Sequence, residues 1–519
     1  LRNVRRVRKF FVSIRPSAPS GGGPLVSGTP VFPVKRFMKN NALLHASILG
    51  ASLALALPAF AQVGRRFPSE KKVVIDPVTG VPLTFLTSTP AGDSKIYQTH
   101  SQWTADGKWV VFRSNRAPGG QAMAVNEETG DIVQLTEDGY MGMLCNARHS
   151  MKLYIMRNLD PEAGRGRGGR GRAAAGANGV ARSLNPNPGE APATGAAAAP
   201  VRGSGANRSR GPFAIIEIDL ASLFADSAAS TLQPAAHYER TCGKFPDGMF
   251  ADGNMGLDAN EDYLYCRERG DEVSSLLPAG EKPAERFGPR GMGAGPTGLA
   301  SMNLKTGEVK NIVTVPFQIG HVQTNPWVPG EIVFCWETGG KAPQRTWTVM
   351  ADGTGLRPLY PEAPYDWITH EAVISKDEVA IAILAHRHPG LAADVDWGPE
   401  SSTGEHPTGV AIVNLRTRVM RIVGQVPVGD PGRSDWHVNG SADGRWAVCD
   451  DFQYRLWLID RHTGEMALLA DLGHKTGAQD HVHPTFSADS TRIEVQTAML
   501  SADNRSLNIC VVPVPKSWL

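Results

Sequence analysis

The sequence predicts an all-β fold, a seven-bladed β-propeller in which an N-terminal strand closes the ring. Between residues 70 and 519 there is almost no helical periodicity. Instead, runs of about five or six alternating or continuous apolar residues are separated by Gly, Asp and Asn, as in all-β proteins. A pattern of two hairpins also recurs about every forty to seventy residues, and seven such units can be counted.

Each unit opens with a short strand, a tight turn and a second strand, and five units carry a histidine at the same place. Four copies align without gaps and start at His100, His370, His437 and His483, while the copy from His321 has a slightly longer turn. The first strand of a propeller blade lines the central channel, so we expect these imidazoles to face one small volume. A polar side chain tolerated near a wet channel would explain any one of them. Five imidazoles crowded together, however, would repel one another on protonation unless a cation were present.

Each unit closes with a second hairpin, whose turn contains glycine at Gly130, Gly307, Gly355 and Gly464. Glycine supplies the positive φ that such turns need. Residues 71–88, "KKVVIDPVTGVPLTFLTS", remain outside the seven units. We expect them to complete the last blade, because closing the ring removes exposed sheet edges.

The N-terminal region reads as two segments that do not belong to the fold. Residues 1–37 are basic and rich in Pro and Gly, and we interpret them as an over-called start before Met38. Residues 38–61 combine a basic start, an apolar run and an A-x-A site at Ala59 to Ala61, which predicts a secretory signal peptide; an uncleaved anchor is the alternative. We therefore expect a periplasmic or secreted protein without a membrane partner after cleavage, with residues 62–519 forming a single propeller domain.

Residues 163–211 interrupt the second unit with eight arginines among Gly, Ala, Pro and Ser. Such a segment buries too little apolar area to fold, so we expect a disordered insertion. Its RGG-like composition can bind nucleic acid, but in an exported protein an idle or polyanion-touching loop is the better interpretation. A second long loop, 385–407, has the length of a functional lip.

The composition excludes some functions. Lys and Arg (53) nearly balance Asp and Glu (51), so no overall charge indicates a nucleic-acid or membrane partner. Six cysteines are few for a fold that depends on disulfides, and most of them end strand-like runs, so we predict buried thiols. The sequence indicates no particular oligomeric state.

The stretch "QDHVHPTFSADSTRI" (479–493) suggests a metal site. In a strand, alternate residues point to one side, so Gln479, His481 and His483 could face the channel together. With an imidazole from another blade they would form a neutral N/O site suited to a divalent first-row ion such as Mn²⁺, with Zn²⁺ or Ca²⁺ less clear. The alternative is that the stretch merely begins one more β-strand.

Three channel motifs resemble the oligogalacturonate lyases, seven-bladed propellers that act on pectin fragments. The motifs are "QIGHVQTNPWVPGEIVFCWETGGKAPQRTWTVMADGTGLRPL", "THEAVISKDEVAIAI" and "QDHVHPTFSAD", and the resemblance runs from about residue 68 to the end. It implies His321 as the catalytic base and Arg345 beside the same strand as a substrate-binding residue. It implies a manganese site formed by His370, Gln479, His481 and His483.

The chain departs from the family pattern at two places. It has "WETG" from Trp336 where the family usually reads His-Glu-Gly, and the insertion 163–211 is foreign to the family. The arginine that assists the base has three candidates, Arg267, Arg269 and Arg290.

The resemblance implies β-elimination on a uronate oligosaccharide, and the residue types fit this chemistry. The proton at C5 lies next to a carboxylate, and a divalent ion on that carboxylate would stabilise the charge that develops when a histidine base removes the proton. An acidic oligosaccharide also needs cationic subsites. Arg113 and Arg345, which follow the second strands of their blades, are the candidates, although solvated loop charges are common.

Two other classes remain open at this stage. A non-enzymatic propeller of the TolB type, which binds proteins, shares "TADGKWVVFRSNR" but has no need for the histidine set. A propeller hydrolase or lactonase would gather Asp, Glu and Asn around calcium. The sequence contains no phosphate loop, nucleophile elbow or CxxC pair, which argues against nucleotide, serine-hydrolase and thiol-redox functions.

Overall fold

The computed structural model describes residues 62–160, 212–286, 292–338, 342–362, 366–386, 409–425, 435–473, 475, 478 and 481–518. The expectations for residues 1–37, 38–61 and 163–211, and for Gln479 and Arg290, concern parts of the chain outside these ranges.

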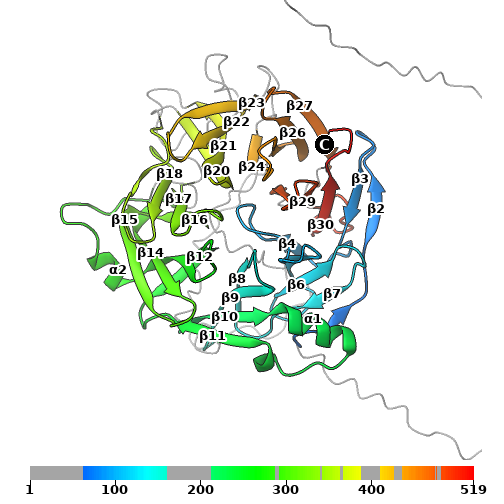
Figure 1. Ribbon diagram of the computed structural model, residues 1–519, viewed down its shortest axis with the longest axis horizontal. Helices are drawn as coiled ribbons and strands as arrows, with labels where there is room; N and C mark the ends of the chain where they lie inside the picture. Colours follow the sequence, from blue (N-terminus) through cyan, green and yellow to red (C-terminus); the bar gives the residue numbers. More distant parts are fainter. Residues whose placement is uncertain are drawn as a thin grey trace, which may run out of the picture. The chain divides into compact units, whose positions relative to one another are not determined.

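Seven antiparallel sheets follow one another around a ring and form the predicted seven-bladed propeller (Figure 1). The first blade comprises β4 (Asp93–Lys95), β5 (Trp109–Ser114), β6 (Gln121–Asn126) and β7 (Ile132–Gln134), with β1 (Arg66–Phe67) as an outer fifth strand. The second comprises β8 (Tyr140–Asn146), β9 (Lys152–Asn158), β10 (Phe213–Asp219) and β11 (Glu239–Lys244). The third comprises β12 (Phe250–Leu257), β13 (Tyr263–Arg269), β14 (Ala294–Asn303) and β15 (Val309–Phe317).

The fourth blade comprises β16 (Ile319–Thr324), β17 (Glu331–Trp336), β18 (Thr346–Met350) and β19 (Arg357–Pro358). The fifth comprises β20 (Asp366–Ser375), β21 (Glu378–His386), β22 (Gly409–Asn414) and β23 (Met420–Gln425). The sixth comprises β24 (Asp435–Gly440), β25 (Trp446–Asp451), β26 (Arg455–Asp460) and β27 (Met466–Asp471). The seventh comprises β28 (Thr485–Phe486), β29 (Arg492–Thr497), β30 (Asn508–Pro513), β3 (Pro82–Phe85) and β2 (Lys72–Ile75).

The seventh blade joins the two ends of the ring, as the leftover segment 71–88 predicts. Strand β3 pairs antiparallel with β30, with Thr84 opposite Val511 and Phe85 opposite Cys510. Leu83 and Phe85 are fully buried in the core between the sixth and seventh blades. Burial of each such side chain contributes roughly 1.5–3 kcal/mol, so the closing strand is held by packing as well as by its ladder.

Strand β5 shows why the apolar runs of the sequence form strands buried on both faces. Val111 packs in a core shared with Leu153 of the second blade. Val110 and Phe112 instead pack in a core shared with Ile509 of the seventh blade. Because successive side chains of a strand point to opposite faces, a continuous apolar run fills both gaps between neighbouring blades.

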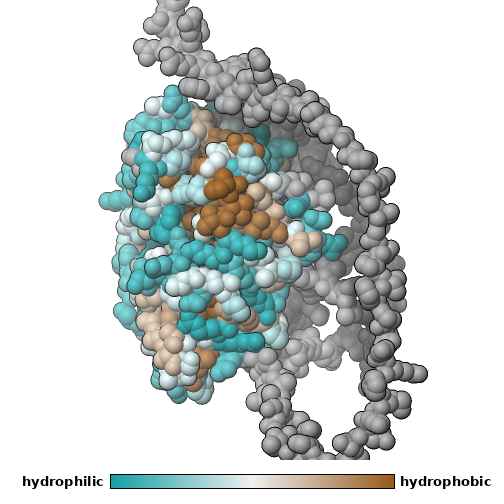
Figure 2. All heavy atoms as spheres, turned by 90° about the vertical axis from the view of Figure 1, so that its right-hand side faces the viewer, coloured by the Kyte–Doolittle hydropathy of each residue, from teal (hydrophilic) through white to brown (hydrophobic). Residues whose placement is uncertain are grey.

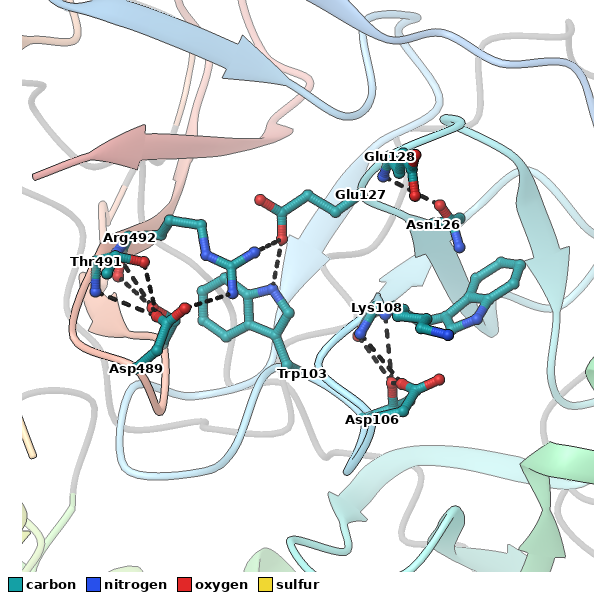
Figure 3. A network of polar contacts seen from close by, with 12 residues as sticks. Trp103, Asp106, Lys108, Asn126, Glu127, Glu128, Asp489, Thr491 and Arg492 are labelled. Atoms are coloured by element: carbon teal, nitrogen blue, oxygen red, sulfur yellow. Dashed lines mark hydrogen bonds and ion pairs between the residues drawn. The ribbon is translucent and has the colours of Figure 1, made fainter.

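Polar side chains add a second connection between the first and seventh blades (Figure 3). Arg492, at the start of β29, forms an ion pair with Glu127, which follows β6, at 2.6 Å. The same carboxylate accepts a hydrogen bond of 2.8 Å from the indole of Trp103. Arg492 also pairs with Asp489 at 3.3 Å, so one guanidinium links two hairpin turns of different blades.

Among the residues that the structure describes, helical structure is limited to short segments between strands, as the sequence predicts. They are α1 (Leu220–Ala229), α2 (Asp271–Ser275) and the 3₁₀ turn Ala235–His237. Asp219 caps α1 by accepting hydrogen bonds from the backbone N–H groups of Ala221 and Ser222. In the described part of the chain, every helix is too short or too polar to cross a membrane.

The six cysteines are all buried thiols, as predicted from their positions at strand ends. The outer surface carries some apolar side chains. Figure 2, which faces the side of the ring where β2 and β3 lie in Figure 1, shows hydrophobic side chains gathered among polar ones. On β2, Val73 and Ile75 are 60% and 59% exposed.

Candidate active site

Imidazoles from four consecutive blades meet in the centre of the ring. The ring centroid of His370 lies 5.8 Å from that of His321 and 4.1 Å from that of His437. The ring centroid of His437 lies 4.1 Å from that of His483 and 5.2 Å from that of His481. The two rings of the seventh blade, His481 and His483, are 5.7 Å apart. Four of the five repeated histidines therefore converge as expected, and His481 joins them.

Irregular backbone directs several of these rings. His321, His370 and His483 have positive φ values of 47°, 37° and 51°. Ladder register shifts at the first two sites, between Gly320 and Gln323 and between Thr369 and Glu371. A non-glycine residue in this conformation costs on the order of 1–3 kcal/mol and persists where the surrounding structure enforces it, which is typical of functional sites.

Three imidazoles lie close enough to share one cation. The ligating atoms of His437, His481 and His483 all lie within 4.8 Å of one another. His437 is fully buried and His483 is 3% exposed. A trio of nitrogen donors suits a divalent first-row ion, with room left for oxygen ligands from a substrate.

Asp450 of β25 orients this trio. Its carboxylate accepts hydrogen bonds from His437 Nδ1 at 2.9 Å, from the His437 backbone N–H at 2.6 Å and from the Val482 backbone N–H at 3.1 Å. Burial by itself would raise the pKa of Asp450, but the contacts with His437 more than offset burial and lower it. An ionised carboxylate behind a metal-binding imidazole fixes the tautomer and makes the ring a better ligand.

His370 lies beside this trio. Its Nδ1 lies 2.7 Å from the carbonyl oxygen of Trp436 and 2.9 Å from Oγ1 of Thr369. The resemblance implies His370 as a metal ligand, whereas the structure groups His437 with His481 and His483. The sequence contained a signal for His437, because it heads one of the four gap-free repeat copies.

A second cluster surrounds His321. Its Nδ1 lies 2.8 Å from Glu371 Oε1 and its Nε2 lies 3.2 Å from Glu337 Oε2. Arg345 reaches the same place, with Nε 3.4 Å from Glu371 Oε2 and Nη2 3.4 Å from His321 Nδ1. The four side chains are 5% exposed or less.

Opposite charges lie close together in this second cluster. Burial alone would raise the pKa of Glu371, but the neighbouring His321 and Arg345 lower it. Burial opposes the charge of Arg345, yet the adjacent Cys335, Glu371 and Glu337 side chains raise its pKa. His321, Cys335 and Glu371 have ligand atoms close enough for a metal. The guanidinium of Arg345 places a positive charge beside these atoms, which disfavours a further cation there.

Tyr97 connects the two groups. Its ring centroid lies 4.9 Å from that of His321 and 5.1 Å from that of His483, and its hydroxyl lies 3.4 Å from His321 Nε2. Tyr97 is 4% exposed. The imidazole trio and the His321 cluster therefore form one continuous site, built from blades four to seven and from Tyr97 between β4 and β5.

Two sequence expectations need correction. Arg113 lies within β5 instead of in the loop after it, is 4% exposed, and donates to the carbonyl oxygens of Gly142 and Lys95 at 2.5 and 2.8 Å. His100 lies 2.5 Å through Nε2 from the Met255 carbonyl oxygen and 2.7 Å through Nδ1 from Thr99 Oγ1, instead of joining the other imidazoles.

Of the arginines considered as helpers of the base, Arg267 donates to the carbonyl oxygen of Ile319 at 2.6 Å and is 5% exposed. It therefore supports the strand that carries His321. Within the described ranges, the guanidinium of Arg345 contacts that ring directly.

Comparison with solved structures gives matches of different quality. An oligogalacturonate lyase in complex with manganese matches with a TM-score of 0.60 and 16% identity, over 88% of this chain and 100% of that chain. An oligogalacturonate lyase from Vibrio parahaemolyticus matches with a TM-score of 0.59 and 16% identity, over the same shares. TolB from Acinetobacter baumannii gives a TM-score of 0.33 at 10% identity, over 84% of this chain and 66% of that chain. No family model matches the sequence, and no curated protein does.

Proposed function

We propose that this propeller is a metal-dependent polysaccharide lyase that cleaves uronate oligosaccharides, of the oligogalacturonate type, by β-elimination. The observation that carries the proposal is the trio His437, His481 and His483 at the hub, with His370 in ring contact with it. The same fold in two oligogalacturonate lyases, one of them a manganese complex, supports this choice of reaction.

The trio fits a divalent ion, and we propose Mn²⁺. Nitrogen donors backed by a buried carboxylate suit first-row divalent ions better than Ca²⁺, which prefers oxygen ligands. Held there, such an ion supplies positive charge beside the uronate carboxylate and so makes the neighbouring C5 proton easier to remove.

We assign the base to His370. Its Nδ1 lies 2.7 Å from a carbonyl oxygen, which can only accept, so Nδ1 carries the proton and the basic lone pair is on Nε2. His321, the base that the resemblance implies, instead has a carboxylate against each ring nitrogen. In the reaction, the C5 proton passes to His370, the C4–O4 bond breaks, a C4–C5 double bond forms, and the departing O4 takes up a proton.

Arg345 is suited to an acidic substrate. Its Nη1 is buried and makes no hydrogen bond to any described residue. Glu371 and His321 contact the rest of the guanidinium, so Nη1 is the donor left for an oxygen of the sugar once the site opens to admit it. Arg345 is therefore the substrate-binding candidate that lies beside the imidazoles at the hub.

The proposed substrate is consistent with the proposed cellular location. The partner is an acidic oligosaccharide, and the segment 38–61 leads us to propose that the enzyme meets it in the periplasm or outside the cell.

The experiment is to strip the protein with a chelator, reload it with Mn²⁺ and add digalacturonate and longer oligogalacturonates. We expect a rise in ultraviolet absorbance from the unsaturated product, which a hydrolase would not generate. Oligosaccharides of the corresponding neutral sugar serve as the control, and they should give no signal. Absence of product from every uronate tested with the ion bound would exclude the proposed reaction.

A further inference from the structure

The indole of Trp436 lies against one imidazole of the proposed metal trio. Its Nε1–H donates a hydrogen bond of 3.0 Å to Nδ1 of His481, one of the three imidazoles of the proposed metal trio. A neutral imidazole has one nitrogen with an in-plane lone pair and one nitrogen that carries a proton. While the indole holds that lone pair, His481 has none to give to an ion through either nitrogen.

We propose that Trp436 is a latch on the metal site: its indole N–H holds the lone pair of His481, and a divalent ion binds fully only when the indole moves away. This inference rests on the metal site of the proposed function. It adds that the third ligand becomes available through a side-chain movement, so that ion binding and the position of Trp436 are coupled.

The surroundings of Trp436 allow this movement. The residue is partly exposed, unlike the buried His437 that follows it. It lies at the start of β24, where the ladder with β25 shifts register between Asp435 and Val438. The indole contacts Phe452, with ring centroids 4.7 Å apart, and His370, at 4.8 Å. Trp436 belongs to none of the apolar cores of the described residues, so a rotation about its side-chain bonds would break these ring contacts and leave those cores packed.

Of the other two imidazoles of the trio, His437 is held differently, whereas His483 accepts a similar but longer hydrogen bond. Asp450 accepts from Nδ1 of His437, which leaves the lone pair of that ring on Nε2. Nδ1 of His483 lies 3.2 Å from Nε2 of Gln496, a longer contact. The Gln496 amide is buried and fixed by the carbonyl oxygen of His481 at 2.7 Å and the backbone N–H of Lys95 at 2.9 Å. The hydrogen bond from Trp436 to His481 is thus shorter than the one to His483, and the side chain that donates it is partly exposed.

The movement would leave His370 in place. The carbonyl oxygen of Trp436 lies 2.7 Å from Nδ1 of His370, and this contact involves the backbone and not the indole. Movement of the indole therefore frees the lone pair of His481, while His370, the proposed base, keeps its tautomer. Phenylalanine at position 436 would remove the N–H donor and keep both the backbone contact and an aromatic ring.

The first measurement is the Kd for Mn²⁺, obtained from the electron paramagnetic resonance signal of the unbound ion. We expect Trp436→Phe to lower the Kd by about three- to ten-fold, because the ion no longer competes with a hydrogen bond. The matched control is Trp347→Phe, which removes an indole donor of the same 3.0 Å length, to the carbonyl oxygen of Gln344, and should leave the Kd unchanged. An unchanged or raised Kd for Trp436→Phe, with an unaltered melting temperature, would overturn the latch.

The second measurement is made on the wild-type protein, and Trp436→Phe serves only to assign one signal. In protein labelled with ¹⁵N-tryptophan, the indole N–H signal of Trp436 is identified by its loss in Trp436→Phe. Addition of diamagnetic Zn²⁺ to the wild type should move this signal upfield as the hydrogen bond to His481 is lost. An indole signal that stays in place while Zn²⁺ binds would also overturn the latch. A protein that binds the ions but cleaves no uronate contradicts only the proposed reaction.

Discussion

His437 and Asp450 form a buried pair in which Nδ1 of the imidazole lies 2.9 Å from Oδ2 of the carboxylate. The histidine comes from the innermost strand of the sixth blade and the aspartate from the strand next to it. Asp450 also accepts from the backbone N–H of Val482, between the two histidines of the seventh blade. One carboxylate thus holds ligands from two blades.

We expect Asp450→Asn to weaken Mn²⁺ binding by about 10- to 100-fold, the usual effect of losing a carboxylate behind a metal-bound histidine. Ion binding, measured by calorimetry, checks this. The matched control is Asp451→Asn, because that side chain bonds to Arg455 and Trp457 instead of a histidine. Equal affinities for the two variants would show that Asp450 does not act on the ion.

His370→Gln and His321→Gln distinguish the two candidate bases. If His370 is the base, its replacement should lower kcat by about 10²- to 10⁴-fold while the protein still binds Mn²⁺. His321→Gln should act mainly through the His321 cluster, with a lower free energy of unfolding and a smaller loss in kcat. The reverse order of the two kcat values, in variants that remain folded, would return the role to His321.

Because of the environment of His100, we expect the free energy of unfolding to decrease in acid. Burial lowers the pKa of this imidazole from 6.5 to about 4. As the pH falls from 6.5 towards 4, the unfolded chain binds a proton that the folded chain does not, so the free energy of unfolding decreases. The full effect is present only below the folded pKa, and we expect a loss of roughly 2 kcal/mol by pH 4.5.

The check is urea unfolding of wild type and His100→Gln at pH 7 and at pH 4.5. Glutamine retains a donor for the carbonyl oxygen of Met255, so the variant should fold and should lose less stability between the two pH values. The same loss in both proteins would place the acid sensitivity elsewhere.

Phe85→Ala tests the closure of the ring. The side chain is fully buried on β3, which joins the N-terminal region to β30, and its removal should lower the free energy of unfolding by about 3–5 kcal/mol. Val73→Ala on the adjacent β2, where the side chain is 60% exposed, is the control and should change stability by about 0.5 kcal/mol or less. A small effect at Phe85 would mean that the ring does not depend on this strand.

The sequence by itself determined the propeller. Apolar runs such as Val110 to Phe112 require packing on two faces, the repeated hairpin turns define the blades, and the leftover segment 71–88 supplies the closing strand. The repeated histidine also predicted an imidazole cluster at the hub, because equivalent positions of every blade face the same channel.

Only the tertiary structure decided which histidines act together. The repeat gives His100, His370 and His437 the same place within their blades, but the distances between them depend on the angle around the ring and on the bulges that turn each side chain. His437 therefore joins the trio, His370 lies beside it, and His100 pairs with a backbone carbonyl group.

The spacing of residues in the sequence also could not predict the hydrogen-bond partners of these histidines. Asp450 and Glu337 follow the repeated histidines at no fixed interval, because they belong to second strands or to the loops after them. Trp436 reaches His481 across a gap of 45 residues between two blades. Hydrogen bonds over such separations depend on the packing of neighbouring blades, and no local pattern records that packing.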